Sequence, residues 1–132
     1  MPKTVVIVGA LDTKGEDFRF VKELIEAHGL ATLVVDVGPM GPPGLAPDVT
    51  RADVAAAAGA DLARLASGDH KDEAMGAMAA GAAVIARRLR AQGRLDGIFS
   101  MGGSGGTSIA TAAMRALPVG VPKLMVSTMG GG

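Results

Sequence analysis

The apolar positions of this chain follow two patterns, which are continuous runs and stripes with helical spacing. The continuous runs are rich in β-branched residues and predict strands that are covered on both faces. They lie at residues 4–10, 30–37, 97–101 and 121–128. Helical patterns separate these strands, so the strands are expected to pair in parallel through right-handed crossovers.

The apolar stripes predict the helices between the strands. The first helix is expected at about residues 15–28, where Thr13 and Glu16 have the spacing of a capping box with Thr13 as N-cap. The longest stripe predicts a helix from about 71 to 92, capped by Asp69. Shorter helical segments are predicted at 50–59, 61–66 and 108–117. Residues 38–47 hold four prolines and three glycines and predict a long loop.

These elements predict an α/β fold, a Rossmann-like or flavodoxin-like three-layer sandwich. Its mostly parallel, four-stranded sheet is expected in the order 2-1-3-4. The strand order then reverses between the first and third strands, and ligands of open α/β sheets bind at the carboxyl ends of the strands beside such a switch point. We expect one domain over residues 1–129, followed by a glycine tail at 130–132.

A glycine-rich stretch between the third strand and the next helix is the strongest candidate for a binding site. It consists of Gly102, Gly103, Ser104, Gly105, Gly106, Thr107 and Ser108. A glycine-rich turn at a helix N-terminus exposes backbone amides and carries partial positive charge, which suits a phosphate or a carboxylate. The stretch lacks the lysine of a phosphate loop, and its dinucleotide fingerprint ends in serine rather than glycine. A tight structural turn is the alternative.

A second polar segment, Asp12, Thr13 and Lys14, follows the first strand and is expected to face the glycine stretch. The Lys14 ammonium could approach bound phosphates, Asp12 could hold a Mg²⁺ water or a ribose hydroxyl, and Thr13 offers an oxygen. The alternative is a helix cap, a solvated lysine and a turn-stabilising carboxylate. Asp36 ends the second strand, where it either approaches a ribose or braces the loop.

Composition narrows the classes of function. Thirteen basic residues balance thirteen acidic ones, and the chain has only three aromatic side chains, so neither a basic surface nor base-stacking platforms for nucleic acid are expected. No apolar run has membrane-spanning length, and the chain has no cysteine, which favours a soluble, cytoplasmic domain. Neither histidine belongs to a cluster with metal-ligand spacing. Ser104 fits a nucleophile elbow, but no histidine follows it as a base.

Several stretches together resemble one family. They lie at residues 8–16, 36–38, 41–43, 48–51, 101–108, 117–123 and 126–129. In this order they resemble the ATP-binding N-terminal domain family of the tomato tobamovirus-resistance protein and its uncharacterised bacterial relatives. The resemblance implies ATP or a related nucleotide near the two polar loops, self-association, and a second α/β half in the full-length family.

The leading hypothesis is therefore a nucleotide-binding domain whose ATP phosphates, with or without Mg²⁺, lie on the glycine stretch. One alternative is that the chain is part of an enzyme acting on a phosphorylated or carboxylated small molecule. Another is that it is a structural self-association domain. A homodimer is expected from the high apolar content, with residues 38–47 and the short helix after them as the interface. The same loop could instead form a lid over the nucleotide.

Overall fold

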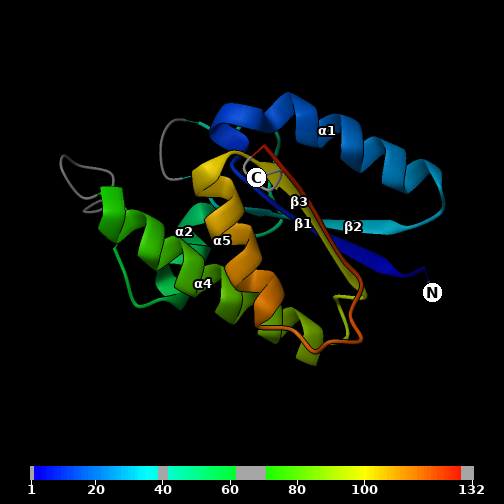
Figure 1. The fold of residues 1–132 in the computed structure, drawn as a ribbon. Helices are drawn as coiled ribbons and strands as arrows, with labels where there is room; N and C mark the ends of the chain where they lie inside the picture. Colours follow the sequence, from blue (N-terminus) through cyan, green and yellow to red (C-terminus); the bar gives the residue numbers. More distant parts are fainter. Residues whose placement is uncertain (1, 39–41, 62–70, 129–132) are drawn as a thin grey trace.

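Four strands form one parallel sheet in the order β2-β1-β3-β4 (Figure 1). The computed structural model of the chain describes residues 2–38, 42–61 and 71–128. The strands are β1 (Thr4–Gly9), β2 (Ala31–Asp36), β3 (Gly97–Gly102) and β4 (Lys123–Ser127). Both the predicted strand order and the predicted fold class are confirmed, and the strand limits differ from the sequence predictions by at most two residues.

Helices cover the two faces of the sheet unequally (Figure 1). The helix α1 (Leu11–Ala27) lies on one face, and α2 (Arg51–Ala57), α4 (Lys71–Ala91) and α5 (Ser104–Arg115) lie on the other. We call the face of the sheet that carries α1 the α1 face, and the opposite face the α5 face. The core on the α1 face contains Ile7, Leu11, Phe18, Val34 and Leu45. The core on the α5 face is larger and includes Val6, Val8, Val35, Val54, Met78, Ile85, Ile98 and Ile109.

The switch point lies between β1 and β3, as the sequence predicts. These strands pair in parallel from Val5↔Gly97 to Val8↔Ser100. Ser100 is fully buried there, and its hydroxyl donates a hydrogen bond to the carbonyl of Val8 across the strand pair. Both strands end at the same edge of the sheet, and a helix starts beside each end (Figure 1).

The short helix α2 follows the sequence prediction closely. Thr50 is its N-cap and forms a capping box with Asp53, in which both hydrogen bonds measure 3.1 Å. Just before it, Val49 forms an isolated bridge with Val35 of β2. A local sequence signal is sufficient here, because the residues that cap the helix are its own neighbours.

The predicted start of the first helix is wrong, and so is the predicted N-cap Thr13. α1 begins at Leu11, directly after β1, and Thr13 lies inside its first turn with its hydroxyl 3.5 Å from the Ala10 carbonyl. Asp36 accepts the hydrogen bond of the first amide, so the turn needs no neighbouring cap. A kink at Lys14 (φ −127°, ψ 25°) separates this turn from the regular helix. That regular part starts near the predicted position.

The glycine stretch is also different from the loop that its composition suggests. α5 begins at Ser104, so Gly105, Gly106 and Thr107 belong to its first turn, and the helix starts four residues before the predicted Ser108. Gly102 is the last residue of β3, and Gly103 alone lies between strand and helix, at φ −89° and ψ −149°. Low intrinsic helix propensity of glycine is overridden here by the packing of α5 onto the sheet and α4.

Some predicted elements lie outside the described residues. They are the Asp69 cap, residues 62–66 of the predicted helical turn and residues 39–41 of the proline-rich loop. Across the described ranges, none of the helices is both long enough and apolar enough to cross a membrane.

Candidate functional site

The candidate site lies at the carboxyl-terminal edge of the sheet, where α1 and α5 begin beside the ends of β1 and β3 (Figure 1). The structure therefore brings together the two segments that the sequence predicts to face one another. They contribute different chemistry. The α5 side supplies backbone amides and hydroxyls, and the α1 side supplies charged side chains.

The first turn of α5 presents donors without a side-chain cap. Its N-cap is Gly103, which has no side chain to accept a hydrogen bond from the first amides of the helix. The amides of Ser104, Gly105 and Gly106 stand at the three first helical positions, which have no acceptor within an α-helix. Among the residues that the structure describes, a Cβ added at Gly106 would meet no atom within 4 Å, and one at Gly105 would meet first the flexible end of Met75 at 3.5 Å. This turn is therefore accessible, and the helix dipole favours an anion there.

The hydroxyl of Thr107 is partly used within the protein. It lies 2.6 Å from the hydroxyl of Ser127 at the end of β4 and 3.5 Å from the carbonyl of Gly102. Thr107 thus fastens α5 to the sheet, and Ser127 is a member of this edge that the sequence reasoning did not select. Its position at the carboxyl end of a predicted parallel strand was the available signal. Ser108 is exposed one residue further, and the side chain of Ser104 lies outside the described part of the structure.

Asp36 braces the α1 side of the site. Its side chain is 1% exposed at the end of β2. Its Oδ1 atom accepts hydrogen bonds from the amides of Leu11 at 3.3 Å and Gly38 at 2.9 Å. Burial raises the pKa of this carboxyl, while the two amides and the charge of Arg51 oppose that rise. Of the two roles that the sequence left open, the hydrogen bonds favour bracing.

Asp12 and Arg51 complete this cluster. Asp12 is half-buried against Gly38, so closely that a Cβ at Gly38 would lie 2.2 Å from the Asp12 Oδ1 atom. Arg51, the first residue of α2, donates from Nη1 to the carbonyl of Gly38 at 3.2 Å. Sequence reasoning did not select Arg51, although it is a basic residue beside the cap of a predicted helix. Lys14 is half-buried at the kink of α1, and Thr13 is exposed.

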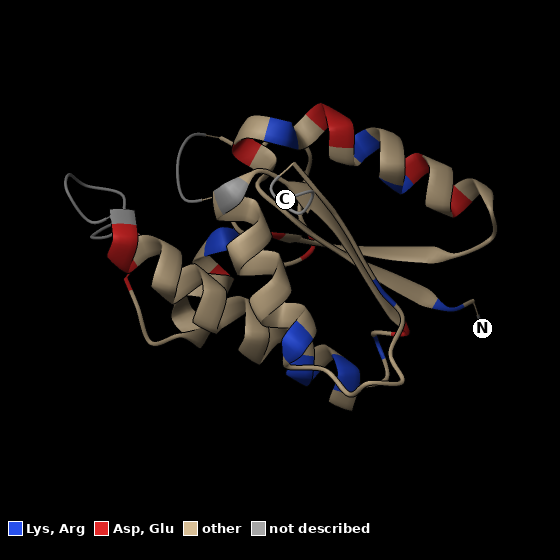
Figure 2. Ribbon diagram, in the orientation of Figure 1, with Lys and Arg blue, Asp and Glu red and all other residues tan. Residues whose placement is uncertain are grey.

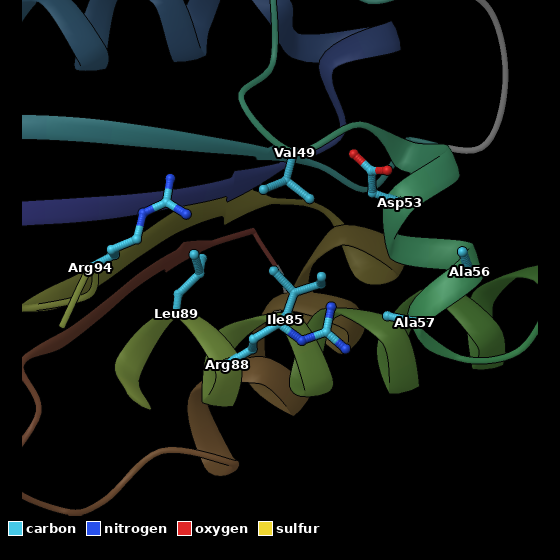
Figure 3. Close-up of a pocket in the computed structure, with 8 residues that line it drawn as sticks. All are labelled: Val49, Asp53, Ala56, Ala57, Ile85, Arg88, Leu89 and Arg94. Atoms are coloured by element: carbon cyan, nitrogen blue, oxygen red, sulfur yellow. The ribbon is translucent and has the colours of Figure 1, made fainter. Parts of the chain in front are cut away.

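A separate cavity of about 380 Å³ lies between α2 and α4 (Figure 3). Its lining consists of Val49, Asp53, Ala56, Ala57, Ile85, Arg88, Leu89 and Arg94. None of the site residues predicted from the sequence is among them. Its one carboxylate, on Asp53, already belongs to the capping box of α2. The cavity therefore adds nothing to the edge at which α1 and α5 begin.

Comparison with known proteins identifies relatives for the whole chain. Residues 3–132 match the family model described as "Uncharacterised protein family (UPF0261) N-terminal domain". A UPF0261 protein of Clostridium tetani is 48% identical over 132 residues, which is all of this chain and 33% of that protein. A UPF0261 protein of Rhizobium meliloti is 42% identical over 130 residues, which is 98% of this chain and 32% of that protein.

A plant protein shares a shorter segment. The ToMV resistance protein Tm-1(GCR237) of Solanum lycopersicum is 50% identical over 38 residues, which is 29% of this chain and 5% of that protein. This short match agrees with the resemblance seen in the sequence but covers much less of the chain than the bacterial relatives do. The chain spans about a third of the length of those bacterial relatives. Because the family model matches nearly every residue, the chain belongs to the UPF0261 family and corresponds to its N-terminal domain.

Proposed function

We propose that this domain binds ATP or a related nucleotide, with the phosphates on the first turn of α5. One observation carries the proposal: α5 starts at the switch point of a parallel sheet with a glycine as N-cap and glycines at its second and third positions. Amides at the first three positions of a helix are a ready site for phosphate oxygens. Glycine at two of these positions lets a large anion approach the backbone.

The α1 side would complete the nucleotide site. Lys14 stands at the kink of α1, so its ammonium can offset phosphate charge. Asp12 would bind a Mg²⁺ water or a ribose hydroxyl, and the exposed Thr13 would add an oxygen. Asp36 holds the amides of Leu11 and Gly38, and it would keep this side in place for the ligand. Thr107 and Ser108 would supply hydroxyls beside the phosphates.

Isothermal titration calorimetry with ATP and Mg²⁺ tests the proposal. Replacing Gly105 with Val puts a branched side chain on the turn where phosphate would approach, and among the described residues the added Cβ would meet the Met75 side chain. We expect affinity for ATP to fall roughly tenfold or more, equivalent to about 1.4 kcal/mol. Gly120→Val is the matched control, because Gly120 lies before β4 and a Cβ there meets no atom within 4 Å.

Circular dichroism should show that both variants keep the fold, so that a loss of binding reports on the site. Unchanged ATP affinity in a folded Gly105→Val protein would contradict the assignment of the phosphates to α5. Equal losses in both variants would mean that valine acts through the fold rather than through the site. Absence of heat with the unsubstituted chain, at millimolar ATP, would contradict nucleotide binding by this domain.

A further inference from the structure

Part of the α1 face of the sheet carries large apolar side chains that none of the described helices covers. β3 and β4 pair with Phe99 opposite Leu124 and Met101 opposite Val126. Phe99 and Met101 pack against the core on the α1 face, and cross-strand partners share a face. Leu124 and Val126 therefore lie on that face, where they are 58% and 53% exposed.

The helix α1 has two different flanks beside this surface. Toward β2, Lys22 pairs with Glu26 at 2.9 Å, and Glu26 accepts a hydrogen bond from Thr32 of that strand. Toward β3, the flank carries two large exposed apolar side chains: Leu24 is 50% exposed, and Phe20, one turn earlier, is 67% exposed. Asp17, one turn before Phe20, is the charged residue of this flank. We call Phe20, Leu24, Phe99, Met101, Leu124 and Val126 together the open face.

A hollow with few polar atoms joins the helix to the strands of the open face. It has a volume of about 440 Å³ and is lined by Val21, Leu24 and Ile25 of α1 together with residues of β3 and β4. β3 has no charged residue and β4 has only Lys123 (Figure 2). The Lys123 ammonium donates to the carbonyls of Pro118 and Val121, so it is held at the start of the strand. Water is therefore in contact with a continuous apolar surface between α1 and the edge strand.

The sheet topology explains which kind of element is missing from this surface. The connection from β3 to β4 passes through α5, on the α5 face. A right-handed crossover from β4 to a further strand beyond it would cross the sheet in the same direction as the connection from β3 to β4. Its helix would therefore lie on that same face. A helix on the open face would therefore come from an element later still, after the chain has turned back toward α1.

We propose that, in a full-length protein of this family, the open face is covered by an apolar helix from the region that follows this domain. The relatives supply the length, because the match covers about a third of each protein and the matched family domain is the N-terminal one. A helix beside α1 would bury Leu24 and Phe20 on one side and Leu124 and Val126 below it. A three-layer sandwich would then be complete on both faces.

Thiol labelling tests this proposal, since the chain contains no cysteine of its own. Leu124→Cys is made in this chain, and the aligned residue is changed to cysteine in the full-length Clostridium tetani relative with its native cysteines replaced. Ala52→Cys is the control in both proteins, because Ala52 is exposed on α2 at the opposite edge of the sheet. Maleimide labelling rates are measured natively and in urea, so that each native rate is referred to the unfolded one.

We expect the site at 124 to label roughly tenfold more slowly, or slower still, in the full-length relative than in this chain, with the control unchanged. Equal rates at 124 in the two proteins would overturn the proposal. Protection that is already present in this chain and grows with its concentration would also overturn it, and would assign the open face to a second copy. If the cysteine variant of the relative fails to fold, hydrogen exchange of the unmodified relative replaces it. Exchange in the segment aligned with β4 as fast as in this chain would again count against the proposal.

Discussion

The close crossing of α2 and α4 makes Gly81 the most sensitive position that we can identify in the core. A Cβ at Gly81 would lie 1.9 Å from the carbonyl oxygen of Val54 and 3.0 Å from its Cγ1 atom. Ordinary contact begins near 3.4 Å, so the helices would have to separate by about 1.5 Å, the difference between 3.4 and 1.9 Å. The obstacle is backbone, which cannot rotate away. Overpacking of this kind typically costs about 1–3 kcal/mol and sometimes more.

Gly76 provides a matched control in the same helix. A Cβ there meets no atom of the described residues within 4 Å, so Gly76→Ala should stabilise the protein by about 0.5–1 kcal/mol through helix propensity alone. Gly81→Ala gains the same amount, about 0.5–1 kcal/mol, but the backbone clash puts its overpacking cost at about 3 kcal/mol or more, so the free energy of unfolding should still fall by roughly 2 kcal/mol or more. The two alanine variants should therefore move stability in opposite directions.

Urea unfolding followed by far-ultraviolet circular dichroism measures both variants, because the chain has no tryptophan or tyrosine for fluorescence. With a slope of about 1–3 kcal/mol per molar urea, the midpoint of Gly81→Ala should fall by roughly 1 M or more. A Gly81→Ala protein as stable as Gly76→Ala would refute the reasoning, since it would mean that α2 can move aside without loss.

Four further predictions concern hydrogen bonds and charge. Asp36→Ala should destabilise the protein by about 2–4 kcal/mol in urea unfolding, because two buried amides lose their acceptor, whereas Asp36→Asn keeps an acceptor oxygen and should lose less. Burial raises the pKa of Asp36 in the folded state above its ordinary value of about 3.8. The free energy of unfolding of the unsubstituted protein, relative to that of Asp36→Asn, should therefore rise as pH falls from about 7 toward about 4. A difference in unfolding free energy that stays constant with pH would contradict this. Thr50→Ala should cost about 1 kcal/mol through loss of the capping box, and no change in the midpoint would count against that role. Lys14→Ala should weaken calorimetric binding of ATP more than that of adenosine, because only ATP carries the charge; equal losses would argue against an electrostatic role.

Sequence reasoning predicted the strand order because uninterrupted apolar strands alternating with helices leave few topologies. It also predicted α2, since the residues that start this helix are adjacent in the chain. It misplaced the start of α1, because the acceptor for Leu11 is Asp36, 25 residues later. It misplaced the start of α5 because glycine usually indicates a loop, and the packing that holds these glycines in a helix comes from other elements.

The sequence predicted that the candidate residues would lie at one edge of the sheet, but it did not predict their contacts. Asp12, Asp36 and the glycine stretch follow strands whose carboxyl ends share one edge, and the structure brings them there. Arg51 and Ser127 were missed because their partners, Gly38 and Thr107, are distant in the sequence. The predicted dimer through residues 38–47 stays a prediction. Among the described residues, the large exposed apolar side chains lie on α1, on β4 and, at Val119, in the loop between α5 and β4.

The position of β1 in the sheet has a consequence for the order in which the chain folds. β1 pairs with β2 across 27 residues, at Thr4↔Ala31, but with β3 across 92 residues, at Val5↔Gly97. Pairings this distant slow folding, because a long loop must close before any contact is gained. On the ribosome, β1, α1 and β2 emerge first and can associate, while the other edge of β1 stays open until β3 has been made. The interval of synthesis between β2 and β3 is then the period when wrong strand pairing is most probable, and a chaperone that acts on this protein would be needed most at that stage.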